Sequence, residues 1–106
     1  MAVRLLLAAS AFLLVGLAGC SGGGGATTEV GIHGFAFDPA SVTISSDESV
    51  TFVNHESTVH TATADGGAFD SGNLDEGEEY EVELPAGSYP YHCTLHPNMR
   101  GTIVVS

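Results

Sequence analysis

The feature that most limits how this chain can fold is the spacing of its apolar residues after residue 28. They come in short runs that alternate with polar residues, and turn-forming residues separate the runs. The clearest run, 79–84, alternates strictly, so its acidic side chains face water and its apolar ones face a core. No stretch has three turns of helical apolar periodicity. The pattern therefore predicts an all-β domain, a sandwich of about seven short strands.

Further runs of strand-forming residues give the remaining expected strands. These runs are residues 30–37, 41–44, 49–54, 60–63, 88–93 and 101–105. An extended strand at the N-terminal edge is not evident from the pattern. The sequence therefore does not determine how that edge of the sandwich is formed.

The first nineteen residues have the pattern of an export signal. One cation, Arg4, precedes an uninterrupted apolar stretch at 5–15, which is too short to span a bilayer comfortably. The sequence Leu-Ala-Gly-Cys at 17–20 resembles the lipobox of lipoproteins, in which the cysteine is lipid-modified and everything before it is removed. We therefore expect a lipoprotein signal peptide at 1–19 and lipidation of Cys20. The alternative is an ordinary secretory signal that leaves Cys20 as a spare thiol.

A lipid on Cys20 would anchor the protein to the membrane from outside the cytoplasm, in the periplasm or at the cell surface. Residues 20–28 would form the lipidated cysteine and a glycine-rich linker, because 22–25 are all glycine. The folded domain is expected at 29–106. Cys93 would then be the one cysteine within it, although a disulfide between Cys20 and Cys93 is an alternative.

The charge balance excludes one class of partner. The formal net charge is −11, there is no lysine, and the two arginines are Arg4 and Arg100. A nucleic-acid binder needs a basic face to displace counterions from phosphates, and this chain has no residues from which to build one. The acidic run at 75–83 is expected to be a solvated strand face. The alternative is a docking patch for a cationic partner.

Three residues that can bind a soft metal ion lie close together near the C-terminus. Cys93, His96 and Met99 are spaced three and three in an expected loop between strands. A thiolate, an imidazole and a thioether suit copper that cycles between Cu(I) and Cu(II). A trigonal His₂Cys centre with a distant axial Met needs one more imidazole. We identify His60 as the candidate, although a single histidine is by itself more often a surface or core residue, and a single methionine is also consistent with core packing.

The chain as a whole resembles the cupredoxins, the blue copper proteins, and among them the amicyanin, plastocyanin and halocyanin group. The resemblance rests on Tyr-His-Cys-Thr-Leu-His-Pro-Asn-Met-Arg-Gly at 91–101 and on the segment from Asn54 to His60, and it extends over about 30–106. It implies a cupredoxin-like Greek-key β-sandwich. It also implies one type 1 copper ion with His60, Cys93, His96 and Met99 as ligands.

The same resemblance assigns roles to two residues around the metal. Asn54 is expected to hydrogen-bond near Cys93 and to tie the two ligand loops together. Leu95 stands where amicyanins and plastocyanins commonly have proline. It therefore keeps a backbone N–H that is expected to donate toward the Cys93 sulfur, which would favour Cu(I).

The implied function is one-electron transport between Cu(I) and Cu(II) at the outer face of a membrane, and no enzymatic activity. The donor and acceptor would be redox proteins, such as a cytochrome, a dehydrogenase or an oxidase. They would contact a monomer transiently near His96, through an apolar patch with Leu95, Pro97 and Met99. The alternative is a copper-binding or delivery protein that uses the same ligands.

Overall fold

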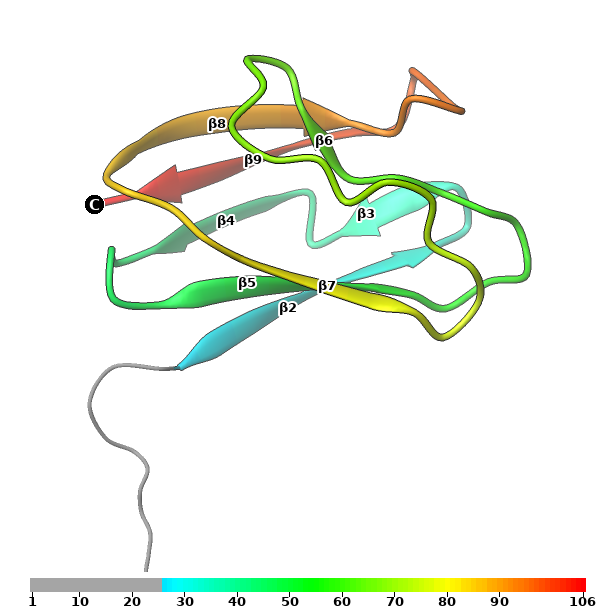
Figure 1. Cartoon of the computed structure of the whole chain (residues 1–106), viewed down its shortest axis with the longest axis horizontal. Helices are drawn as coiled ribbons and strands as arrows, with labels where there is room; N and C mark the ends of the chain where they lie inside the picture. The colour runs from blue at the N-terminus through cyan, green and yellow to red at the C-terminus, as the bar shows by residue number, and fades with distance from the viewer. Residues whose placement is uncertain (1–25) are drawn as a thin grey trace, which may run out of the picture.

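The computed structural model of this chain describes residues 26–106, which form two β-sheets packed face to face (Figure 1). The predicted signal peptide at 1–19 and the predicted lipidation site at Cys20 lie outside the described residues. The strands are β2 (Thr27–His33), β3 (Ala36–Asp38), β4 (Ser41–Ile44), β5 (Ser49–Asn54), β6 (Thr63–Ala64), β7 (Glu79–Glu83), β8 (Gly87–His92) and β9 (Arg100–Val105). Within residues 26–106 no helix is long and apolar enough to cross a membrane.

Each sheet contains four strands. The order is β3-β2-β5-β7 in one sheet and β4-β9-β8-β6 in the other. Two pairings, β2 with β5 and β4 with β9, are parallel, and the other pairings are antiparallel. Because β4 lies in the opposite sheet from its sequence neighbours β3 and β5, the chain crosses between the layers. The predicted all-β sandwich is confirmed.

The structure differs from three sequence expectations about the strands. The run at 30–37 is divided into β2 and β3, because Gly34 and Phe35 form a turn with φ angles of 62° and 55°. The run at 60–63 is reduced to the two residues of β6, and His60 makes only an isolated bridge with Leu74. The chain does have an extended N-terminal strand, since β2 begins at Thr27, within the segment assigned to the linker. This strand lies inside its sheet, between β3 and β5.

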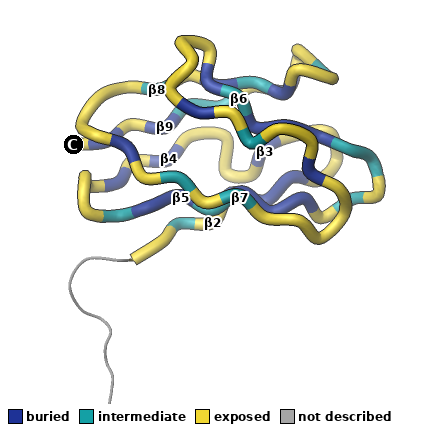
Figure 2. The backbone as a smooth tube through the Cα atoms, viewed as in Figure 1, coloured by how far each residue is buried: buried dark blue, intermediate teal, exposed yellow. Residues whose placement is uncertain are grey.

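Buried stretches of the backbone lie along the strands of both sheets (Figure 2), and aromatic side chains fill the centre of the space between the sheets. Phe52 on β5 and Tyr91 on β8 are fully buried, and their ring centroids lie 5.2 Å apart at a steep angle. Phe37 and Phe69 complete the group, with centroids 4.8 and 6.0 Å from that of Tyr91. Such edge-to-face contacts add to the stability that apolar burial provides. This packed centre fixes the ends of β5 and β8, from which the segments of the candidate site start.

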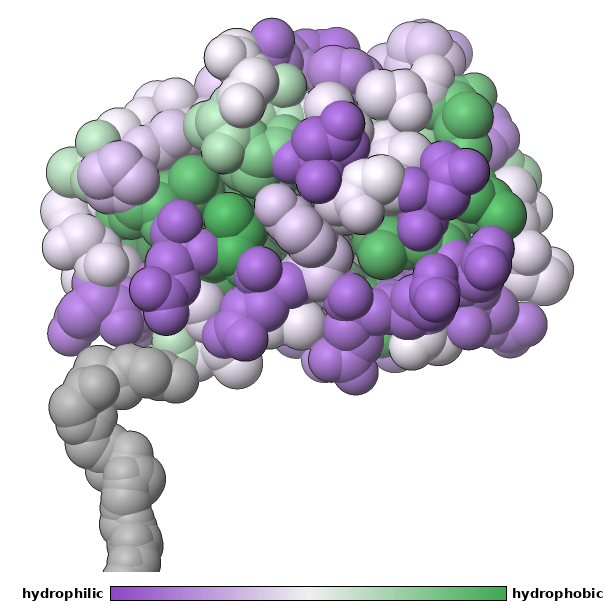
Figure 3. All heavy atoms as spheres, in the orientation of Figure 1, coloured by the Kyte–Doolittle hydropathy of each residue, from purple (hydrophilic) through white to green (hydrophobic). Residues whose placement is uncertain are grey.

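Strand β7 forms one edge of its sheet and carries much of the acidic run. Its acidic residues Glu79, Glu81 and Glu83 are exposed, whereas Tyr80 and Val82 between them pack against the core. Hydrophilic side chains gather on this face of the molecule (Figure 3). Charged side chains on an edge strand discourage pairing with a second sheet. The exposure of these carboxylates agrees with the expected solvated strand face.

Candidate metal centre

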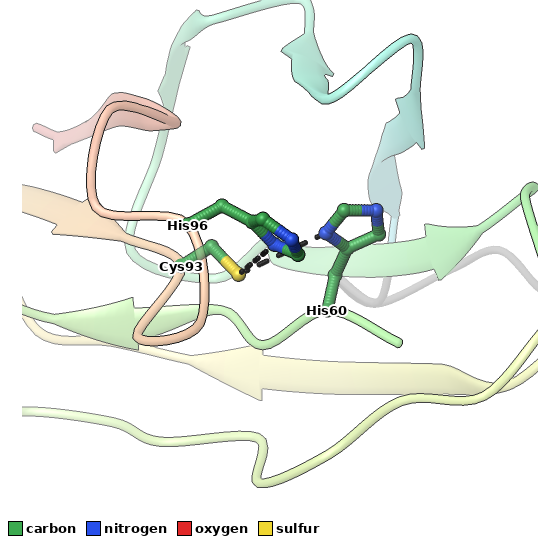
Figure 4. Close-up of side chains that lie close together, drawn as sticks. All are labelled: His60, Cys93 and His96. Atoms are coloured by element: carbon green, nitrogen blue, oxygen red, sulfur yellow. Dashed lines mark hydrogen bonds between the residues drawn. The ribbon is translucent and has the colours of Figure 1, made fainter. Parts of the chain in front are cut away.

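Three side chains from two distant parts of the chain meet at one end of the sandwich (Figure 4). Cys93 directly follows β8, His96 lies in the loop between β8 and β9, and His60 lies between β5 and β6. The Cys93 Sγ is 3.8 Å from the His60 Nδ1 and 3.6 Å from the His96 Nδ1. Cys93 and His60 are fully buried, and His96 is partly exposed.

These separations fit three ligands around one metal ion. Two metal–ligand bonds of about 2.0–2.3 Å that meet at a trigonal angle place their donor atoms about 3.5–3.8 Å apart. The two sulfur–nitrogen distances fall at this spacing. One soft thiolate and two imidazoles are a donor set that suits copper. In the described part of the chain, this is the one group of three such residues whose donor atoms all lie within 4.8 Å of one another.

The loop that carries Cys93 and His96 is closed by its own backbone. The His96 N–H donates to the Cys93 carbonyl oxygen at 3.2 Å, and the Met99 N–H donates to the His96 carbonyl oxygen at 2.8 Å. The Cys93 N–H in turn donates to the Met99 carbonyl oxygen at 3.1 Å. Two consecutive turns therefore hold Cys93, His96 and Met99 in one closed loop. Met99 is 4 % exposed, so its thioether lies inside the protein.

Thr61 joins the two ligand segments. Its backbone N–H donates to the Cys93 Sγ at 3.3 Å, and its Oγ1 accepts the Thr94 N–H at 2.9 Å. An N–H bond to the sulfur withdraws charge from a thiolate. This bond also holds the segment of His60 against the loop of His96. Nothing in the spacing of the sequence identified Thr61, although its position directly after a candidate ligand was a possible signal.

The role expected for Asn54 is wrong. The fully buried Asn54 donates to the Thr58 and Leu74 carbonyl oxygens at 2.9 and 2.8 Å, and its Oδ1 accepts the Glu56 N–H at 3.0 Å. These bonds hold the segment between β5 and His60, not the Cys93 loop. Asn54 therefore holds in place the turn that leads from β5 to His60.

The expected bond from the Leu95 N–H to the Cys93 sulfur is also absent among the described residues. Leu95 occupies the middle of the turn that the His96 N–H closes onto the Cys93 carbonyl, and the Thr61 N–H takes the place at the sulfur. The Leu95 side chain is 49 % exposed. Leu95 therefore contributes to the protein surface above the metal centre.

Glu56 is a site residue that the sequence interpretation missed. Its Oε1 lies 2.7 Å from the His60 Nε2, and its two oxygens accept the Gly34 and Phe35 N–H groups at 3.0 and 3.2 Å. A carboxylate only accepts, so the His60 proton is on Nε2 and the Nδ1 lone pair faces Cys93. Partial burial raises the pKa of Glu56, but the hydrogen bonds from His60 and Phe35 outweigh it and hold that pKa below its usual 4.5.

Phe35 is the third residue at the site that was missed, after Thr61 and Glu56. It is 52 % exposed, and its ring contacts those of His60 and His96 edge-on, with centroids 5.4 and 5.1 Å away. The surface around His96 is thus apolar, as expected, but Phe35 and Leu95 contribute to it and the buried Met99 does not. The signal in the sequence was Gly34, which interrupts the alternation and predicts a turn there.

A polar cluster flanks the loop on the sheet that contains β6, β8 and β9. The Asp65 carboxylate contacts the Arg100 guanidinium and accepts from the His92 Nδ1 at 2.6 Å. The hydrogen bond from His92 holds the pKa of Asp65 below its ordinary value, and the charge of Arg100 adds to the effect. The side chain of His92 belongs to this cluster, so of the two neighbouring residues only Cys93 faces the metal centre.

Comparison with known proteins supports the interpretation of this centre. The sequence pattern of the cupredoxin-like domain matches residues 5–105. Amicyanin of Paracoccus versutus is 35% identical over 82 residues, which cover 72% of this chain and 62% of that protein. Chloroplastic plastocyanin of Chlamydomonas reinhardtii is 38% identical over 96 residues, 76% of this chain and 66% of that protein. The chain thus spans slightly less than two thirds of the length of these two relatives.

Solved structures agree with this result. The crystal structure of Paracoccus versutus amicyanin superposes with a TM-score of 0.68 at 34% identity, covering 76% of this chain and 81% of that one. A Cu(I) structure of an amicyanin variant superposes with a TM-score of 0.71 at 26% identity, covering 76% and 82%. The chain therefore belongs to the cupredoxin-like domain family, and its cofactor is one copper ion.

Proposed function

We propose that this protein is a one-electron carrier that cycles between Cu(I) and Cu(II). His60, Cys93, His96 and Met99 would hold the copper ion through two imidazoles, a cysteine sulfur and a thioether. The observation that carries the proposal is the approach of one cysteine sulfur to two imidazole nitrogens at 3.6 and 3.8 Å. The copper ion would supply the change of redox state, and the protein would supply a fixed set of donors.

The rigidity of the donors supports electron transfer over copper delivery. Cys93 and His60 are fully buried, and the hydrogen bonds of Thr61 and Glu56 hold them through protein atoms alone. A carrier benefits from ligands that move little when the charge of the metal changes. A delivery protein instead has to release its ion, for which buried and hydrogen-bonded ligands are poorly suited.

The surface near His96 supports a transient redox partner. His96 is the partly exposed ligand, and Leu95, Pro97 and Phe35 are exposed around it. A small apolar contact can form and separate quickly, as a carrier requires. The partners would be redox proteins such as a cytochrome, a dehydrogenase or an oxidase, and the protein itself would act as a monomer without enzymatic activity.

The location of the carrier follows from the sequence before the domain. We infer that Cys20 carries a lipid, and that the glycine-rich segment after it tethers the domain to the outer face of a membrane. The domain begins a strand at Thr27, so the tether would be short. Incorporation of a labelled fatty acid, lost in Cys20→Ser, would test this inference.

The copper centre can be tested by adding Cu(II) to the purified full chain. An intense visible absorption from sulfur-to-copper charge transfer is expected, together with fast, reversible reduction. Cys93→Ser should lose this absorption while the fold, measured by circular dichroism, is unchanged. Cys20→Ser is the matched control, because it makes the same substitution at the other cysteine and removes no proposed copper ligand. Tight copper binding without reversible reduction would instead favour delivery.

A further inference from the structure

A second group of metal-binding side chains lies on the outer face of the sheet that contains β2. Glu29 and His33 are on β2, two residues to either side of Gly31, and both are exposed. Asp38 on β3 is the register partner of Gly31, and His55 directly follows β5, the other neighbour of β2. Two imidazoles and two carboxylates therefore surround one glycine.

The four side chains form two pairs. The His33 Nε2 lies 3.2 Å from the Asp38 Oδ2, and the His55 Nε2 lies 3.0 Å from the Glu29 Oε2. All four are at least half exposed, so rotation of these side chains is unhindered by the core. They share no residue with the group of His60, Cys93 and His96.

Gly31 is itself buried, and the two imidazole rings lie over it. A Cβ atom added at Gly31 would lie 3.2 Å from the His55 Cδ2 and 3.6 Å from the His33 Cδ2. Both imidazole rings therefore border the same point above the sheet. A metal ion there requires the two rings to turn from their carboxylates toward that point, and any side chain at position 31 would obstruct them.

The charge and chemistry of this region suit a cation. Imidazole nitrogen and carboxylate oxygen are common ligands of Zn²⁺, and imidazole also binds Cu²⁺. In the described residues the one Lys or Arg is Arg100, and its guanidinium is paired with Asp65. No fixed positive charge is therefore placed to oppose a cation at Gly31, and the formal net charge of −11 attracts one.

We propose that His33 and His55, with Glu29 and Asp38, bind one divalent transition-metal ion of the Zn²⁺ or Cu²⁺ type above Gly31. On binding, the hydrogen of each imidazole moves from Nε2 to Nδ1, which frees the Nε2 lone pair for the metal. The two carboxylates then change from hydrogen-bond acceptors to ligands or counter-charges. The site shares no ligand with the copper centre.

Calorimetric titration of the copper-loaded full chain with Zn²⁺ tests the proposal. Zn²⁺ is the probe because it is colourless, so the visible absorption reports separately that the copper centre is intact. One Zn²⁺ per chain is expected, with at least a tenfold loss of affinity in His33→Ala and in His55→Ala. Glu76→Gln and Asp47→Asn are the controls. Each removes one negative charge away from the proposed site and should leave the Zn²⁺ affinity unchanged.

Gly31→Ala provides a second test that alters no ligand. It should weaken Zn²⁺ binding because the added methyl group lies between the rings, whereas Gly66→Ala, which has open space around it, should not. Equal Zn²⁺ affinity in the parent, His33→Ala and His55→Ala proteins would overturn the proposal. Binding lost equally in the charge controls would also overturn it, because it would show general attraction to an acidic surface.

Discussion

At the scale of single residues, Glu56 connects the copper centre to the surface above it. One carboxylate fixes the ring of His60 and also holds the turn that carries Phe35. Phe35 has a φ of 55°, a conformation that a residue with a side chain adopts only where its surroundings require it. Glu56 therefore controls both the orientation of a ligand and the shape of the proposed docking surface.

Replacement of Glu56 by Gln should raise the reduction potential of the copper centre. A negative charge near the metal stabilises Cu(II) relative to Cu(I), and the amide removes this charge while keeping an acceptor for His60. A charge interaction of about 1 kcal/mol corresponds to an increase of about 40 mV for one electron. Redox titration measures the potential. Glu76→Gln, an exposed change of equal charge, should shift it much less, and an unchanged potential in E56Q would contradict this role.

At the scale of the strands, β8 and β9 are packed too closely for a side chain at one position. Gly101 on β9 pairs with Tyr91 on β8. A Cβ atom at Gly101 would overlap the Tyr91 hydroxyl group and lie 2.7 Å from the Ala40 carbonyl oxygen. The Tyr91 hydroxyl is buried without a hydrogen-bond partner among the described residues, and burial raises the pKa of Tyr91. This tyrosine thus contributes through its ring.

Gly101→Ala should lower the free energy of unfolding by about 1–3 kcal/mol, the usual cost of overpacking a core. Tyr91→Phe should be neutral or slightly stabilising, because it removes a buried polar group that has no partner. Combining the two should recover part of the loss, since only the overlap with the hydroxyl is relieved. Denaturant unfolding of the four proteins in a double-mutant cycle measures this coupling. Additive effects would show that the two residues do not compete for space.

At the scale of the whole molecule, charge should govern how fast electrons are exchanged. The formal net charge of −11 repels anions and attracts cations over the whole surface. Oxidation by a small anionic reagent should therefore accelerate as salt is added, and oxidation by a cationic reagent should slow. Stopped-flow measurements across a range of ionic strength test this. A neutral reagent serves as the control, and the same salt dependence for all three reagents would contradict the prediction.

The sequence by itself determined the strand-rich fold and the types of metal-binding residue. Alternation with period two is a local property, and it placed β4, β5, β7 and β9 within a residue of their observed bounds. Cys93, His96 and Met99 are only six residues apart, so any turn that closes this loop brings them together. These features depend on neighbours in the chain, which is why the pattern was sufficient.

Tertiary structure alone decided what surrounds the metal centre. The bonds of Thr61 to Cys93 and of Glu56 to the turn before β3 join residues 32 and 21–22 positions apart, and no local pattern encodes them. The same holds for the four side chains around Gly31, which come from β2, from β3 and from the residue after β5, and become neighbours only when the sheet pairs. Hydrogen bonds and packing between distant segments are fixed by the register of whole strands, and that register is a property of the folded molecule.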